Sequence, residues 1–299
     1  MRDDEPILAS KHASVLPGEV LHWLDPKPGQ VIVDATLGAG GHTRLIAEKI
    51  GLTGKMISLD CDLTMVDRAK KNLSDITLTT NITFFHASFD QLRQVLDELK
   101  IDAVDGILAD LGICSDQLDD AERGLSFMRD GPLDMRLDTS RGMPVSALVA
   151  QLDERSLADL IYQLGEERLS RRIAKAIVLR RKESPIRTTA DLAELVRKCV
   201  PRSGRIDPAT RTFQAFRIAV NCEMESLDGF LKLIPSCLKQ NGKAVIISFH
   251  SLEDRKVKEA FKDKSRFEAL TRKVVQAGEE ESDQNPRSRS AKLRAAKRV

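Results

Sequence analysis

Asp34-Ala-Thr-Leu-Gly38-Ala-Gly40-Gly41-His42 follows an apolar segment and begins a helical one, and Asp60 ends the next apolar segment. This order is typical of a nucleoside site in an α/β sheet. Glycines let the backbone approach a ligand closely, and the helix N-terminus favours the negative groups of that ligand. Asp60 lies 20 residues after Gly40, the spacing at which an acid on the second strand accepts hydrogen bonds from ribose hydroxyls. The stretch therefore predicts a nucleoside-containing cofactor.

The details of the glycine pattern favour one class of cofactor. A dinucleotide site has the pattern G-x-G-x-x-G, but Thr43 stands where the third glycine would be after Gly38 and Gly40. Asp34 suits a ligand with an ammonium group, such as the methionine end of S-adenosylmethionine. An NAD-linked Rossmann oxidoreductase still fits the sheet and Asp60. A strand–helix turn without a ligand leaves Asp60 unexplained.

Composition limits the class of protein. With 299 residues, 31% charged and 41% hydrophobic, the chain suits one or two globular domains. No apolar run approaches the ~20 residues that span a bilayer, and the acidic start lacks a signal-peptide pattern, so we expect a cytoplasmic protein with no membrane partner. Five scattered cysteines without a C-x-x-C pair, and five scattered histidines, predict neither disulfides nor a metal site.

Apolar and helical segments alternate along the first part of the chain. Strands are expected at residues 31–34, 56–59, 82–85 and 104–111, each followed by a helical or turn segment, and the next comparable strand is 244–249. This alternation predicts an α/β fold with a parallel, Rossmann-like sheet covered by helices. The 130 or so residues before the fifth strand far exceed the ~30 of a βαβ unit, so we expect an inserted helical subdomain.

These expectations divide the chain into four parts. The sheet-forming core has a first part at residues 1–114 and a second part at 206–275. Between them, residues 115–205 form the inserted helical substrate subdomain, and one helix at about 213–233 serves as the crossover to the fifth strand. Residues 276–299 are expected to be a flexible basic tail.

Basic residues gather in two places. Six of them and no acids follow Asn285, which leaves 41 basic against 45 acidic residues in the rest of the chain. A second cluster lies in the predicted insertion and consists of Arg168, Arg171, Arg172, Lys175, Arg180, Arg181 and Lys182. Both clusters fit a solvated surface, but they also fit a track for nucleic-acid phosphates, to which Arg202, Arg205, Arg211 and Arg217 are further candidates. A non-enzymatic RNA-binding ribosome assembly protein would account for the basic tail.

In an open parallel sheet, ligands bind beyond the carboxyl ends of the strands. Asp110 ends the fourth strand, and we expect its carboxylate to accept hydrogen bonds from an amine that is to be methylated. His250, at the end of the fifth strand, could contact the same base or a phosphate, although a buried histidine beside a helix-capping Ser251 fits equally well. Phe89 follows the third strand, where it could contact an adenine ring or pack in the core.

Several longer segments resemble one family, the bacterial 16S ribosomal RNA cytosine-N4 methyltransferases (RsmH or MraW). The resemblance runs from about residue 10 to the C-terminus. It is carried by residues 12–21 (HASVLPGEVL), 34–42, Asp110-Leu-Gly, 117–138 (QLDDAERGLSFMRDGPLDMRLD), 209–218 (ATRTFQAFRI), 248–255 (SFHSLEDR) and 285–298. Residues 117–138 and 248–255 are the most specific of these.

The resemblance implies methyl transfer from S-adenosylmethionine to N4 of one cytidine in the decoding region of 16S ribosomal RNA. By the same resemblance, the cofactor-binding residues are Gly40, Gly41, His42, Asp60, Phe89, Asp110 and Gln117. Gln117 is supplied by the resemblance alone. The sequence departs from the family pattern at Pro17, at Cys61 beside the ribose acid, and at Cys114-Ser115-Asp116. It does not indicate the oligomeric state, or whether naked RNA or an assembled subunit is the substrate.

Overall fold

The computed structural model describes residues 14–76, 81–202, 204 and 206–299. The chain forms two compact units. The first consists of Met1–Cys114 and Glu225–Val299, and the second of Ser115–Met224. None of the helices in the described ranges has the length and apolar content that a membrane span requires.

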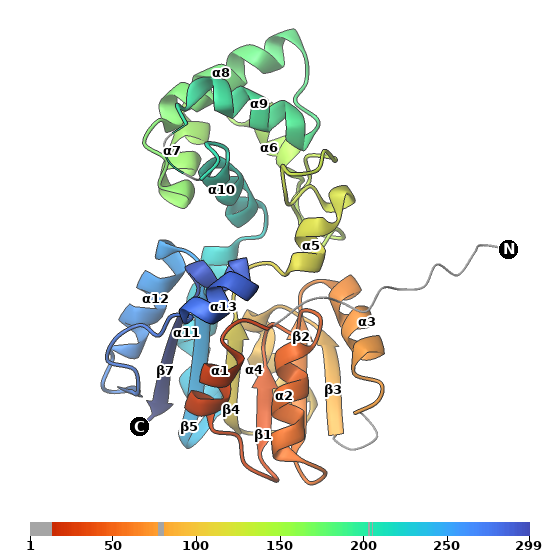
Figure 1. Ribbon diagram of the computed structural model, residues 1–299, viewed down its shortest axis with the longest axis vertical. Coiled ribbons are helices and arrows are strands. Elements are labelled where there is room, and N and C mark those ends of the chain that lie inside the picture. Colours follow the sequence, from red (N-terminus) through yellow and green to blue (C-terminus); the bar gives the residue numbers. More distant parts are fainter. Residues whose placement is uncertain (1–13, 77–80, 203, 205) are drawn as a thin grey trace, which may run out of the picture. The chain divides into compact units, whose positions relative to one another are not determined.

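A seven-stranded sheet forms the centre of the first unit (Figure 1). Its strands are β1 (Val31–Asp34), β2 (Lys55–Asp60), β3 (Asn81–His86), β4 (Val104–Asp110), β5 (Leu238–Ser248), β6 (Phe267–Ala269) and β7 (Lys292–Arg298). Their order is β3-β2-β1-β4-β5-β7-β6, with β1 to β5 parallel and β7 antiparallel to both of its neighbours. The predicted α/β sheet is confirmed.

The order of the strands reverses between β1 and β4. From β1 the chain runs outward through β2 to β3, returns to β4 on the other side of β1, and later continues to β5. Asp34, Asp60 and Asp110 are the last residues of β1, β2 and β4. Because these strands are parallel, the three acids lie along one edge of the sheet, around the switch point where such sheets bind ligands.

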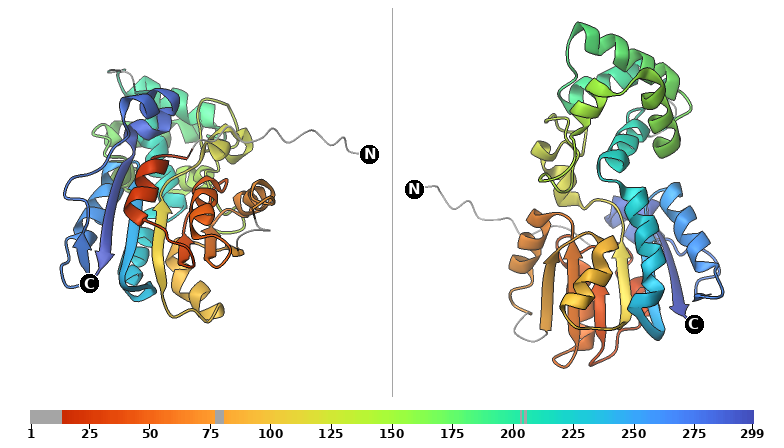
Figure 2. Two further views of the ribbon diagram at one scale, coloured as in Figure 1. Left: turned by 60° about the horizontal axis from the view of Figure 1, so that its bottom comes forward. Right: turned by 180° about the vertical axis from the view of Figure 1, so that it is seen from behind.

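Helices cover both faces of this sheet (Figures 1 and 2). The first unit contains α1 (Pro17–Leu24), α2 (Gly41–Ile50), α3 (Leu63–Asn72), η1 (Phe89–Gln91), α4 (Leu92–Glu98), α11 (Glu223–Cys237), α12 (Ser251–Phe261), α13 (Glu279–Gln284) and η3 (Pro286–Ser290). Two views show α1 and α2 on one face and α4 and α11 on the other. Pro17, a departure from the family pattern, is the first residue of α1, where its missing amide hydrogen costs nothing.

The expectation of a flexible tail over residues 276–299 is wrong. Residues 279–290 form α13 and η3, and β7 pairs along its length with β5. Leu293 and Ala295 are fully buried in the core that β1, β4, β5 and α1 share. Burying one leucine side chain stabilises a fold by about 1.5–3 kcal/mol, so the alternating apolar residues of this segment outweigh its charges. The signal in the sequence was the spacing of Leu293 and Ala295 two positions apart, which is typical of a strand, within a segment rich in basic residues.

The second unit is helical. It contains α5 (Ser115–Asp119), η2 (Ala121–Arg123), α6 (Val145–Gln151), α7 (Glu154–Gly165), α8 (Ser170–Glu183), α9 (Thr189–Cys199) and α10 (Thr210–Val220). Helix α7 packs against α8 and α10, and α8 packs against α9. Thr188 and Asp191 form the predicted capping box at the start of α9. The unit begins at residue 115 but extends to Met224, rather than ending at 205.

The expected crossover helix over residues 213–233 is in fact two helices, α10 and α11. Asn221 lies between the two helices, and its side chain forms hydrogen bonds with the backbone of a distant segment. Its amide donates to the backbone oxygen of Met135, and its oxygen accepts from the backbone amide of Leu137. The next residue, Cys222, has φ +49, which is incompatible with a continuous α-helix. The helical periodicity of the sequence does not reveal this tertiary contact.

Candidate functional site at the sheet edge

The glycine loop begins at Asp34, whose carboxylate is fixed by the loop itself. Asp34 is 1% exposed and accepts hydrogen bonds from the Thr43 hydroxyl at 2.7 Å and the Thr36 amide at 3.2 Å. Burial raises the pKa of Asp34 to about 6, while the bonds from Thr43 and Thr36 oppose that rise. Thr43, which replaces the third glycine of a dinucleotide site, therefore joins the start of α2 to the end of β1.

Two of the predicted cofactor glycines have no room for a side chain. A Cβ atom on Gly41 would lie 2.2 Å from the Ser14 hydroxyl oxygen, and one on Gly40 would lie 2.9 Å from Leu73 Cδ1. Gly40 also has φ +90 and stands as the N-cap residue of α2. Among the described residues no side chain of the N-cap position caps α2, and the N-terminus of a helix favours an acceptor on a ligand.

Asp60, at the end of β2, is hydrogen-bonded to the glycine loop. Its Oδ2 accepts from the Gly38 amide at 2.8 Å, and its Oδ1 accepts from the Asp62 amide at 2.9 Å. These two amides fix the orientation of the carboxylate at the end of β2. Cys61, which departs from the family pattern beside this acid, has its backbone oxygen 3.0 Å from Nε2 of His86.

Asp110 and His42 lie close together at the end of β4. Oδ2 of Asp110 is 3.8 Å from Nε2 of His42, and the Asp110 amide donates to the Thr36 hydroxyl at 2.6 Å. Oδ1 of Asp110 is buried and has no hydrogen-bond partner within the described part of the chain. Burial raises the pKa of Asp110 to about 7; the positive charge of Arg287 lowers it, and the charges of Asp34 and Glu253 raise it further. A buried acceptor that lacks a donor is costly unless a ligand supplies one.

Phe89 is the first residue of η1, directly beyond β3. Its ring is partly exposed and lies 5.2 Å from the ring of Phe230 on α11, at an angle of 54°. The core-packing and ligand-contact interpretations of Phe89 are therefore compatible, because packing against Phe230 fixes the ring while part of it stays accessible.

Gln117 belongs to the second unit. It lies on the short helix α5 and is 5% exposed. Asp116, a departure from the family pattern, stands in the first turn of the same helix, where a negative charge is favourable. Cys114 lies at the end of the first unit's segment, and its thiol contacts Met65 Sδ at 3.4 Å.

His250 is the N-cap residue of α12, a role that we expected of Ser251. Its Nδ1 accepts from the Glu253 amide at 3.4 Å, and Oε2 of Glu253 accepts from the amides of Phe249 and His250 in return. The His250 side chain is 9% exposed, with Nε2 at 3.2 Å from Oε1 of Glu253. These contacts account for His250 and Glu253 as a reciprocal helix cap.

Arg287 is a residue of this site that the sequence analysis missed. We assigned it to a solvated basic tail, but its guanidinium donates to the backbone oxygen of Ile113 and lies 5.6 Å from the centre of the Phe249 ring. Ile113 is 174 residues earlier in the chain, so no local pattern could reveal the contact. Glu253 was also missed, although the spacing His-x-x-Glu was a visible capping signal.

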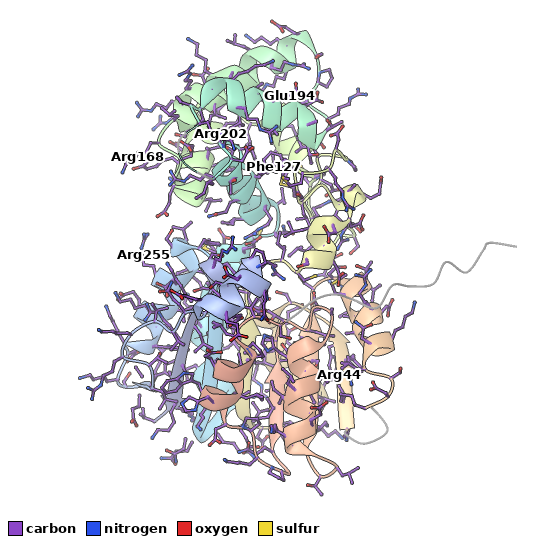
Figure 3. All side chains as sticks on the ribbon, viewed as in Figure 1. Arg44, Phe127, Arg168, Glu194, Arg202 and Arg255 are labelled. Carbon is purple, nitrogen blue, oxygen red and sulfur yellow. The ribbon has the colours of Figure 1, made fainter. Side chains whose placement is uncertain are left out.

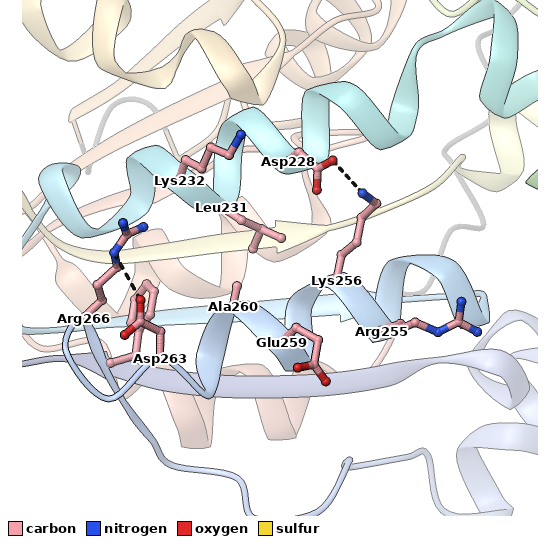
Figure 4. A pocket seen from close by; sticks show the side chains of 10 residues that line it. Asp228, Leu231, Lys232, Arg255, Lys256, Glu259, Ala260, Asp263 and Arg266 are labelled. Carbon is pink, nitrogen blue, oxygen red and sulfur yellow. Dashed lines mark hydrogen bonds and ion pairs between the residues drawn. The ribbon is translucent and has the colours of Figure 1, made fainter.

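A separate pocket of about 440 Å³ lies between α11, α12 and the start of β6 (Figure 4). Leu231, Ala260 and Phe267 contribute apolar surface, and charged side chains line the rest. Two of the cations are paired there, Lys256 with Asp228 at 2.6 Å and Arg266 with Asp263 at 3.3 Å. None of the predicted cofactor residues lines this pocket.

Comparison with known proteins identifies the family. A family model described as the MraW methylase family matches residues 9–299. The chain belongs to this family. Ribosomal RNA small subunit methyltransferase H of Sorangium cellulosum is 47% identical to this methylase over 97% of this chain and 91% of its own length. The protein of the same name from Synechocystis is 45% identical, over 96% of this chain and 93% of its own.

The solved structures that match this methylase have lower sequence identity to it. A putative rRNA-methylase from Clostridium thermocellum is 13% identical, with a TM-score of 0.46 over 95% of this chain and 93% of that one. Membership of the MraW methylase family makes the chain an S-adenosylmethionine-dependent methyltransferase, as the sequence predicted. It gives no support to an NAD-linked oxidoreductase or to a non-enzymatic assembly protein.

Proposed function

We propose that this methylase transfers a methyl group to N4 of a cytidine in the decoding region of 16S ribosomal RNA, in the cytoplasm. Support comes from nearly full-length similarity to proteins named ribosomal RNA small subunit methyltransferase H. The observation in the structure that favours an amine substrate is the buried Oδ1 of Asp110, an acceptor that lacks a donor among the described residues. An exocyclic amine carries the N–H groups that such an acceptor needs.

The edge of the sheet fits the cofactor. Asp60 would accept hydrogen bonds from the ribose hydroxyls, because it ends β2 at the edge where parallel sheets bind ligands and the Gly38 amide fixes its position. Gly40, Gly41 and His42 would lie along the cofactor at the start of α2, and Phe89 would contact its adenine. We extend this assignment to Gln117 on the strength of the family resemblance. When bound, S-adenosylmethionine supplies an electrophilic methyl group, and the electrons of the broken bond stay on its sulfur.

Asp110 would act on the substrate amine. The lone pair of a cytosine N4 is delocalised into the ring, which makes the nitrogen a weak nucleophile. A carboxylate that accepts a hydrogen bond from this amine localises the pair and stabilises the positive charge that develops on nitrogen. The Thr36 hydroxyl fixes the backbone of Asp110 and His42 lies beside its Oδ2, so the acceptor is held in place before the substrate arrives. His250 stays a second candidate for contact with the base.

The second unit offers cations for the RNA backbone. The exposed basic residues there include Arg168, Arg171, Arg172, Lys175, Lys182, Arg202 and Arg211, of which Arg168 and Arg202 are labelled in Figure 3. Such residues add affinity without reading sequence. Two other candidates are used internally, since Arg181 donates to the backbone oxygens of Val149 and Leu152, and Arg217 forms an ion pair with Glu223 at 2.8 Å. Arg205 lies outside the described residues.

The basic C-terminal residues are less suited to this role than we expected. Arg294 pairs with Asp254 at 2.6 Å, Lys297 pairs with Glu268 at 2.8 Å, and Arg298 donates to the backbone oxygen of Leu238. These contacts hold β7 to its surroundings. Deleting residues 285–299 would therefore remove a buried strand, and point substitutions on the second unit are the better test of RNA contact.

The test is methyl transfer from isotopically labelled S-adenosylmethionine to small ribosomal subunits, and to naked 16S RNA, from cells that lack this enzyme. Digestion to nucleosides and mass spectrometry should show labelled N4-methylcytidine at a single position. Asp110→Ala should yield almost none under the same conditions. Label on another base, on protein or nowhere would contradict the proposal.

A further inference from the structure

Arg287 reaches the methyl-transfer site from a segment far along the chain, and its position is well fixed. It lies in η3, which connects α13 to the buried strand β7. The Ser288 hydroxyl donates to the Asn285 oxygen at 2.8 Å, and Ser288 is 1% exposed. On the other side of η3, Glu281 of α13 accepts from the Leu16 amide at 2.7 Å. The segment is thus fastened on both sides of Arg287.

Two contacts of Arg287 lie at or beside the turn that follows Asp110. Its guanidinium donates to the backbone oxygen of Ile113, and it lies 5.6 Å from the centre of the Phe249 ring. A Cβ atom on Gly112 would lie 3.4 Å from the same ring, and Gly112 has φ +94. The turn is therefore held between the Phe249 ring and the guanidinium of Arg287.

The charge of Arg287 also acts on the carboxylate. Among the described residues, the charges of Asp34 of β1, Glu253 of α12 and Arg287 of η3 act on Asp110, and the His42 ring of α2 lies 3.8 Å from it. Asp34 and Glu253 disfavour an ionised Asp110, as does burial, whereas the guanidinium favours it. The amine-accepting role requires the ionised form, which the charge of Arg287 favours.

We propose that Arg287 is a positioning residue for methyl transfer, which holds the turn at residues 110–114 and brings a positive charge to the Asp110 carboxylate that receives the substrate amine. The proposal rests on the proposed function, because it assigns Asp110 to the amine. Arg287 does not touch the reacting atoms in this scheme. Through Arg287, the C-terminal segment would contribute to the reaction as well as to the sheet.

Two substitutions separate shape from charge. Arg287→Gln removes the charge and keeps a polar side chain of similar reach, whereas Arg287→Lys keeps the charge and loses the planar group that bridges the Ile113 oxygen and the Phe249 ring. Arg289→Ala is the matched control, because Arg289 lies two residues away on the same short helix and is exposed, and its contacts with Ser282 at 2.9 Å and Asp283 at 4.0 Å are to the preceding helix α13. Thermal unfolding of each variant shows whether it is folded at the assay temperature.

Turnover is measured against pH with saturating cofactor and RNA. We expect Arg287→Gln to lower kcat about tenfold or more at pH 7 and to move the acid limb of the profile up by about one pH unit. Arg287→Lys should lower kcat less and leave the acid limb in its wild-type position, and Arg289→Ala should match the wild type. In the Asp110→Asn background, Arg287→Gln should cause no further shift of the limb. An Arg287→Gln profile that coincides with the wild-type profile would overturn the proposal.

A second measurement needs no RNA. The Asp110 carboxyl group is titrated by carbon NMR in the wild type, Arg287→Gln and Arg289→Ala, with Asp110→Asn assigning its resonance. The midpoint should rise in Arg287→Gln alone, and an unchanged midpoint would refute the electrostatic role even if the enzyme proved to methylate something else. Absence of cytidine methylation by the wild type, with the midpoint shifted as expected, would instead count against the proposed function only.

Discussion

The Gly38 amide donates to Oδ2 of Asp60 at 2.8 Å, so the acid at the end of β2 is joined directly to the glycine loop that follows β1. The two residues are 22 positions apart; Gly38 lies in the loop after β1, and Asp60 ends the neighbouring strand β2. The loop and the acid thus form one unit, in which the conformation of the loop depends on the carboxylate as well as on its glycines. Substituting Asp60 therefore affects both the ribose contact and the loop.

Asp60→Ala should reduce affinity for S-adenosylmethionine by on the order of a hundredfold or more, because a charged hydrogen bond contributes about 1.5–3 kcal/mol and the carboxylate would make two to the ribose. Isothermal titration calorimetry measures the loss. Asp75→Ala is the control, since Asp75 is an exposed acid of the same unit that pairs with Arg44. Equal affinities for Asp60→Ala and the wild type would remove Asp60 from the ribose role.

Asp110→Asn should lower kcat by about tenfold to a hundredfold, because the neutral amide keeps an acceptor oxygen but no longer balances the charge that develops on the amine. Asp110→Ala should lower kcat further, since it lacks both. Single-turnover methylation with saturating cofactor measures the chemical step. Cofactor affinity should change less than turnover in both variants; the reverse pattern would assign Asp110 to cofactor binding alone.

The stability of the cofactor-free protein should fall as pH rises through the pKa values of two buried acids. Burial raises the pKa of Asp34 to about 6 and that of Asp110 to about 7, both from 3.8. The folded protein therefore holds these protons more tightly than the unfolded chain, so their contribution is fully present below about pH 4 and is lost as pH rises through 6 and 7. Urea unfolding at pH 5 and pH 8 measures the difference.

Asp110→Asn is the matched variant for this effect, because it removes the titration and leaves the shape of the side chain. It should exceed the wild type in free energy of unfolding by on the order of 1 kcal/mol at pH 8 and lose that advantage at pH 5. A variant that is less stable than the wild type at both pH values would show that the Asp110 carboxylate has stabilising partners in the free protein.

The sheet and its acidic edge were predictable because their signals are local. An apolar strand, a glycine turn and a helix start follow one another within residues 31–50, and the position of Asp60 at the end of the next strand fixes its place at the same edge. The position of Asp110 at this edge was predictable in the same way, because it ends the fourth strand. The hydrogen-bond partners of these acids were not predictable. Thr43 reaches Asp34 and the Gly38 amide reaches Asp60 only because of the conformation of the glycine loop.

Contacts between distant segments were not predictable. Residues 285–298 contain many charged side chains, but Leu293, Ala295 and Ala296 lie among them and are buried, and all three pair with β5. Arg287 contacts Ile113 only because β7 returns the chain to the sheet. Likewise, Asn221 interrupts a periodic helix through bonds to Met135 and Leu137. In each case, tertiary packing decided the role of a residue that local pattern assigned otherwise.

His250→Asn should separate helix capping from a role in the reaction. Asparagine is a strong N-cap residue, so its oxygen can replace Nδ1 as the acceptor for the Glu253 amide. If capping is the whole role, His250→Asn should keep wild-type stability and kcat, and His250→Ala should lose about 1 kcal/mol of stability. Thermal unfolding and turnover are measured on both variants. A large fall in kcat for a stable His250→Asn would place the imidazole at the substrate.

Arg171 and Arg172, both exposed on α8, should contribute to the salt dependence of RNA binding. Each phosphate that a cation neutralises adds about 0.7–0.9 to the slope of log affinity against log salt, so the double change to alanine should reduce that slope by about 1.5 and leave cofactor affinity unaltered. Filter binding to 16S RNA over a range of salt concentrations measures it. Lys262→Ala with Lys264→Ala removes two exposed cations from the first unit and is the control. Because loss of any two charges lowers the net charge equally, equal slopes for the two double variants would assign the effect to net charge rather than to contacts made by α8.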